Sequence, residues 1–180
     1  MQQFDLQCAP KKKFGLFGSI FFAGVVIGSL ILPRLSDIVG RKKLAILGNL
    51  VHLAAVFITL ISHSLSLSLM MIFLMGIAMG GRVFVGYIFM SENMMTKDIS
   101  KATSFMFGLD SLVICFAALY FRFISKDWRT LFIFPIILQG IATLTMMRQH
   151  ESPKYYYAIG EYEKAREVLT SIGMTNGVLN

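Results

Sequence analysis

Two charged residues lie inside apolar stretches of the sequence. Arg82 stands in Gly80-Gly81-Arg82-Val83, in the middle of one apolar run, and Asp110 lies inside the next. At the centre of a membrane such a charge costs about 2.5–3.5 kcal/mol even on a lenient insertion scale, so each should face a cavity or a partner. Alternatively, Arg82 snorkels from a span that begins later, and Asp110 lies near the interface. Asp110 could pair with Arg82, bind a cationic solute or carry a proton, and the sequence does not choose among these roles.

A second set of charged residues lies at the ends of the apolar runs. Asp37 and Arg41 stand between the first two runs, and Glu92 and Glu151 follow later ones. Their charges are complementary and all four fall on the same side of the topology derived below, so we expect them to cluster. The simpler interpretation is a solvated loop whose charges only set the orientation of the chain.

The reactive residues do not indicate an enzyme. His52, His63 and His150 are scattered without metal-ligand spacing, and Cys8 and Cys115 are too few and too far apart for a disulfide framework or a zinc site. The sequence holds no nucleophile elbow, phosphate loop or pair of catalytic carboxylates. We therefore expect no enzymatic activity, no metal and no cofactor.

The composition is typical of a membrane protein. Hydrophobic residues make up 56% of the 180 residues and charged residues 15%, against about a quarter in soluble domains. The net charge is +7, but every Lys and Arg except Arg82 lies at the end of an apolar run or between two runs. The sequence lacks a basic stripe interleaved with aromatic residues, so we expect the lipid bilayer as a partner and no nucleic acid.

Five apolar runs are long enough to cross a membrane as helices, which takes about 17–25 residues. They cover residues 14–32, 44–61, 65–90, 103–124 and 130–147. Barrel-type alternation is absent, and the backbone of such runs must satisfy its hydrogen bonds within helices. The sequence therefore predicts an all-α fold, a polytopic transmembrane helix bundle. Two small-xxx-small patterns, Gly24/Gly28 and Gly76/Gly80, predict close helix packing.

The basic residues predict the orientation of the spans. The loops 34–43 and 91–102 and the segment after residue 147 hold ten Lys and Arg, and the opposite side holds six. We therefore expect the C-terminus in the cytoplasm. The three basic residues Lys11, Lys12 and Lys13 oppose this orientation, which indicates that the native N-terminus is not Met1.

Residues 148–180 are more polar than the spans, and we expect them to form a cytoplasmic segment. Apolar residues recur there on one helical face: Ile159, Tyr162, Ala165, Leu169 and Ile172. This spacing predicts a short amphipathic helix on the cytoplasmic surface, which Gly173 can end.

Five segments carry motifs in a defined order. They are residues 3–8 (QFDLQC), 35–42 (LSDIVGRK), 86–92 (GYIFMSE), 127–129 (DWR) and 151–165, which contains ESPK and GEYEKA. Together they resemble the N-terminal half of a major facilitator superfamily transporter, closest to its organic cation/anion transporter-like or sugar-porter-like branch. Pro33 departs from the family, which has glycine at this position.

The resemblance implies that the chain is a fragment covering helices two to six of an N-terminal six-helix half. The first helix and the C-terminal six-helix half are then expected as partners. Residues 1–13 become the remnant of an extracellular loop, which accounts for the basic residues there. The implied function is transport of a small organic solute, an organic ion or a sugar-like molecule, by alternating access within a larger transporter. The alternative is a truncated, non-transporting membrane protein or a partner of a full-length relative.

The resemblance also implies roles for the charged residues. In the family, the Arg in the position of Arg41 pairs with acids at the cytoplasmic end of the same half, here Glu92 and Glu151. The acid in the position of Asp37 faces a helix N-terminus of the opposite half, where the helix dipole favours it. Such pairs close the inner gate in one state and break in the other. Because the fourth family helix borders the central cavity, Arg82 is expected to line the substrate path.

Overall fold

The computed structural model describes residues 11–175, which are helical almost throughout. The helices are α1 (Lys11–Val39), α2 (Arg41–Ile61), α3 (Leu65–Met79), η3 (Gly80–Val85), α4 (Gly86–Glu92), α5 (Thr96–Phe123), α6 (Trp128–Arg148), α7 (Pro153–Ala158) and α8 (Tyr162–Thr175). Five helical stretches are long and apolar enough to cross a membrane, with α3, η3 and α4 joined into one. This confirms the expected all-α bundle. The expected loop remnant 1–13 lies largely outside the described residues, and its last three residues already belong to α1.

Two helices extend well beyond the apolar runs from which they were expected. The α1 helix continues past Pro33 to Val39, where an expected loop over 34–43 is reduced to Gly40. The α5 helix begins at Thr96 and not at residue 103. The reason is that hydropathy marks the part of a helix that hydrocarbon surrounds, whereas charged turns beyond it can continue the same helix.

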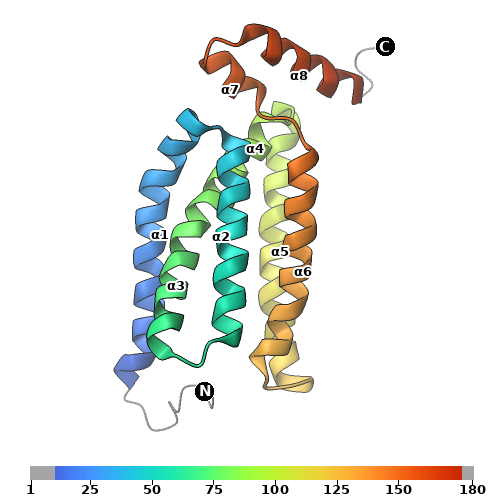
Figure 1. Ribbon diagram of the computed structural model, residues 1–180. Helices are drawn as coiled ribbons and strands as arrows, with labels where there is room; N and C mark the ends of the chain where they lie inside the picture. Colours follow the sequence, from blue (N-terminus) through green and yellow to red (C-terminus); the bar gives the residue numbers. More distant parts are fainter. Residues whose placement is uncertain (1–10, 176–180) are drawn as a thin grey trace.

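The first four helical elements form the tightly packed part of the bundle (Figure 1), in which α1 and α2 both lie against α3 and η3. Glycines permit this approach: a Cβ at Gly24 would lie 3.0 Å from the Ile77 backbone nitrogen, and one at Gly80 would lie 3.0 Å from the Gly28 Cα. A Cβ at Gly76 would in turn lie 3.0 Å from the Gly24 Cα. The structure thus brings the two glycine pairs of the sequence into direct backbone contact.

The segment after α6 forms two helices where the sequence predicted one. Gly160, with φ +81°, separates α7 from α8, so Ile159 lies outside the expected amphipathic helix. Ala165 and Val168 are the buried residues of α8, whereas Leu169 is exposed, and the helix passes Gly173 to end at Thr175. Both helices lie across one end of the bundle (Figure 1).

Candidate functional site: a charge network and a buried polar cluster

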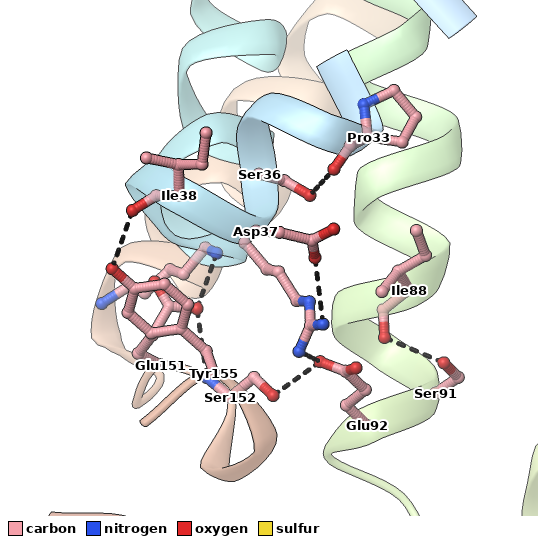
Figure 2. Close-up of polar contacts among 12 residues, drawn as sticks. Pro33, Ser36, Asp37, Ile38, Ile88, Ser91, Glu92, Glu151, Ser152 and Tyr155 are labelled. Atoms are coloured by element: carbon pink, nitrogen blue, oxygen red, sulfur yellow. Dashed lines mark hydrogen bonds and ion pairs between the residues drawn. The ribbon is translucent and has the colours of Figure 1, made fainter. Parts of the chain in front are cut away.

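The end of the bundle nearest α7 carries a network of charged side chains (Figure 2). Arg41, the first residue of α2, forms an ion pair with Asp37 at 3.1 Å, one turn earlier in the chain, and a second with Glu92 at the end of α4. Gly40 creates this geometry because its φ of +112° turns the chain between the two helices within one residue. We call Asp37, Arg41 and Glu92 the charge network.

The two ion pairs differ in their exposure to solvent. The side chains of Arg41 and Glu92 are 15% and 9% exposed, whereas that of Asp37 is 65% exposed. Glu92 also accepts a hydrogen bond of 2.6 Å from the Ser152 hydroxyl. The shielded pair therefore links α2, α4 and the start of α7, while the outer pair is open to screening by salt.

Glu151 does not pair with Arg41 as expected but binds the backbone N–H of Lys42, the residue after Arg41. Its carboxylate, on a residue only 7% exposed, accepts hydrogen bonds from the N–H of Lys42 at 2.8 Å and of Ser152 at 3.1 Å. The first N–H groups of a helix lack partners within it, and the helix dipole favours a negative charge there. Glu151 thus caps α2, which has glycine as its own N-cap residue.

Three residues around the charge network were not singled out from the sequence. The Lys42 ammonium donates to the Met147 carbonyl at 2.9 Å, near the C-terminal end of α6, and the Tyr155 hydroxyl donates to the Ile38 carbonyl at 3.3 Å. Ser152 is the third, through its bond to Glu92. Only the position of Ser152, between an acid and a proline that starts a helix, offered a signal in the sequence.

Arg82 lies in η3, a π-helical stretch within an otherwise α-helical span. Its guanidinium donates to the Gln139 side-chain oxygen of α6 at 3.3 Å, and the same oxygen lies 3.1 Å from His52 Nδ1 of α2. The Gln139 amide nitrogen donates to the Asn49 backbone carbonyl at 3.3 Å. These four half-buried residues form what we call the polar cluster.

Asp110, the other charged residue inside an apolar run, lies on α5 and is exposed in this chain. It is near enough to Arg82 to interact with it electrostatically. Among the described residues, however, the two form no ion pair within 4 Å. The structure therefore places both charges in the same region without joining them.

The sequence did not predict that Asn49, His52 and Gln139 meet. Asn49 and His52 are three residues apart, which places them on one face of α2, and Gln139 is a polar residue within an apolar run. Their meeting depends on how α2, η3 and α6 pack, which periodicity does not reveal. Across residues 11–175, no three His, Cys, Asp or Glu residues are grouped so that they could hold a metal ion.

The sequence of this chain is similar to that of a known protein family. The family described as "Sugar (and other) transporter" matches residues 3–179. A Xenopus tropicalis protein, solute carrier family 22 member 15-like, is 31% identical across 92% of this chain and 34% of its own length. Organic cation/carnitine transporter 4 of Arabidopsis thaliana is 26% identical across 98% and 34%, and organic cation/carnitine transporter 2 of Homo sapiens 23% across 98% and 32%. The chain spans about a third of the length of these relatives.

Proposed function

Because this chain belongs to the sugar (and other) transporter family, we propose that it forms part of a membrane transporter that moves a small organic solute by alternating access. The relatives carry the names of solute carriers and organic cation or carnitine transporters, which supports an organic ion as the solute class. Five helices that can span a membrane support the same proposal.

The observation that carries this proposal is the charge network with its helix cap. The shielded Arg41–Glu92 pair and the Glu151 carboxylate tie the start of α2 to α4 and to the start of α7. Each of these bonds joins two separate elements through at least one side chain, and none is a backbone–backbone bond within a helix. They can therefore break without unfolding any helix. A set of ion pairs that closes one end of the bundle and opens as a unit is the two-state element that alternating access needs.

The test is to replace Arg41 in the complete transporter that contains this segment. Arg41→Ala should slow uptake of the solute by more than it lowers the amount of protein at the membrane. Lys43→Ala is the matched control, because Lys43 is an exposed cation two residues away. Uptake that is unchanged in Arg41→Ala would rule out the gate role of the charge network.

Further helices are part of this proposal. In the described chain α5 makes few close contacts with other helices, whereas α3 packs against both α1 and α2. We infer that α5 packs against the first helix of the family, and that a C-terminal six-helix half faces the bundle. Arg82 and Asp110 would then line the substrate path between the halves, because neither charge is tolerated in hydrocarbon.

The proposed orientation places the C-terminus, α7, α8 and the charge network in the cytoplasm, since that side has more Lys and Arg. A glycosylation acceptor inserted at residues 62–64 should be modified, and one added after Asn180 should not. The reverse result would overturn this orientation while leaving the fold in place.

A further inference from the structure

We propose that the polar cluster of Asn49, His52, Arg82 and Gln139 is a binding subsite for a carboxylate group of the solute. This inference rests on the transport function proposed above and names the chemical class that the transporter would select. It depends on the hydrogen-bond directions in the cluster, its charge balance and its rigidity.

The hydrogen-bond directions follow from Gln139, whose side-chain amide has two distinct ends. Its nitrogen lies 3.3 Å from the Asn49 backbone carbonyl, which can only accept, so its oxygen faces Arg82 and His52. His52 Nδ1 must therefore carry the hydrogen in this contact. Arg82 and His52 both donate to this oxygen, which fixes the orientation of the amide, and the donors left for a ligand are the remaining N–H groups of Arg82.

The charge of the cluster is positive and has only neutral partners. A guanidinium has five N–H donors, and the bond from Arg82 to Gln139 uses one of them. Among the described residues, no carboxylate lies within ion-pair distance of Arg82, and Asp110 acts on it only at longer range. One carboxylate would balance the single charge, and its two oxygens match the planar fork of a guanidinium.

The cluster is also held rigidly. A Cβ at Gly48 of α2 would lie 2.9 Å from the backbone nitrogen of Arg82, so the backbones of α2 and η3 are in direct contact beside the cluster. The Gln139 side chain of α6 is held by the bond of 3.3 Å that its amide nitrogen donates to the Asn49 backbone carbonyl of α2. Groups held in place before binding lose less entropy when the ligand arrives.

The test measures binding of three probes that share one ring: phenylacetate, phenylacetamide and phenethylammonium. The purified chain in an uncharged detergent is heated with each probe, and ligand binding is measured from the shift in the unfolding midpoint. We expect the unfolding midpoint to rise with the concentration of phenylacetate and to stay unchanged with the other two probes. In Arg82→Gln the apparent Kd for phenylacetate should weaken by at least about tenfold, which is the loss expected for one charge-assisted hydrogen bond.

Two further variants keep the test decisive. Gln139→Glu places a carboxylate beside Arg82, so it should keep the fold and lose the response to phenylacetate. Lys97→Gln removes an exposed cation outside the cluster and should bind phenylacetate as the unchanged chain does. A phenylacetate response that survives both Arg82→Gln and Gln139→Glu, no response in the unchanged chain, or a stronger response to phenethylammonium would overturn the proposal.

Uptake by the complete transporter separates this inference from the function on which it rests. If phenylacetate stabilises the chain but no probe is taken up, the transport proposal fails and the carboxylate subsite stands. If phenethylammonium is taken up as well as phenylacetate, transport stands and the carboxylate subsite fails.

Discussion

The helices α1 to α4 and the pair α5 and α6 are similar in apolar character but differ in packing. In the most apolar part of each span, 33% of residues are buried in Leu65–Glu92 and 28% in Arg41–Ile61, against 11% in Gly15–Val39. The corresponding share is 6% in both Thr96–Phe123 and Arg129–Arg148. Since hydropathy is comparable in all of these spans, apolar character alone does not determine which helices pack closely.

The glycines explain much of this difference. Gly24, Gly28, Gly76 and Gly80 each lie against the backbone of a neighbouring helix, whereas a Cβ at Gly108 of α5 or Gly140 of α6 would meet nothing within 4 Å. Without a hydrophobic force between helices in lipid, close packing at small residues is a principal source of association. The comparison teaches that a small residue stabilises a bundle only where a partner helix occupies the surface beside it.

The largest effect should come from the ion pair that closes the packed region. Glu92→Ala leaves the guanidinium of Arg41 shielded without its main partner, and we expect it to lower the free energy of unfolding by about 3 kcal/mol. Glu161→Ala is the control, because the side chains of Glu161 and Lys164 in its ion pair are 42% and 59% exposed, so it should change stability far less. Chemical unfolding in mixed micelles measures both. Equal effects would show that burial does not distinguish the two pairs.

The glycine contrast predicts the next largest effect. Gly76→Ala forces apart backbones already in contact and should destabilise the chain by about 1–3 kcal/mol. Gly108→Ala should instead stabilise α5 by about 0.5–1 kcal/mol, because alanine is the better helix former and has space there. Unfolding of the 180-residue chain compares the two. If the complete transporter responds differently, with Gly108→Ala lowering its stability, a helix packs on that face of α5.

Much of the fold follows from the sequence alone, and the reasons are physical. Apolar runs of membrane length predict the five spans, and small residues four positions apart predict close helix packing, which the structure shows between α1 and the span formed by α3 and η3. Helix ends were less predictable, since α1 continues through Pro33 and α5 begins seven residues early. Neither end is signalled by hydropathy, because charged turns outside the apolar run continue both helices.

The candidate site was predictable only where charge alone sets the contact. Arg41 meets Asp37 one turn away and Glu92 across the bundle, as complementary charges at span ends indicate. Glu151 binds the Lys42 backbone instead, because the open first turn of α2 competes for the carboxylate. The meeting of His52, Arg82 and Gln139 depends on helix packing and on the π-helical turn at Gly80–Val85, neither of which a hydrophobic pattern encodes.

In the less packed region, the ends of the helices should matter more than their faces. Asp127 caps α6 by accepting bonds from the Arg129 N–H at 3.0 Å and the Thr130 hydroxyl at 3.2 Å. Asp127→Ala should therefore cost about 1 kcal/mol. Met95, the N-cap residue of α5, makes no such bond, so Met95→Asp should stabilise α5 by about 0.5–1 kcal/mol. Amide hydrogen exchange in the first turn of each helix measures both changes, and an unchanged rate in Asp127→Ala would contradict the cap.

The smallest effect on stability is expected for Asp37, because its ion pair with Arg41 is more exposed than the Arg41–Glu92 pair. Asp37→Asn removes a carboxylate that is 65% exposed and 3.1 Å from Arg41, so the free energy of unfolding should fall by no more than about 0.5–1 kcal/mol. The proposed gate gives this residue a second partner in the opposite half of the complete transporter, and uptake should therefore fall more than stability does. Asp98→Asn, which changes a carboxylate in the first turn of α5, is the matched control and should leave uptake unchanged. If both variants slow uptake equally, Asp37 contributes only surface charge, and the gate is confined to the shielded Arg41–Glu92 pair.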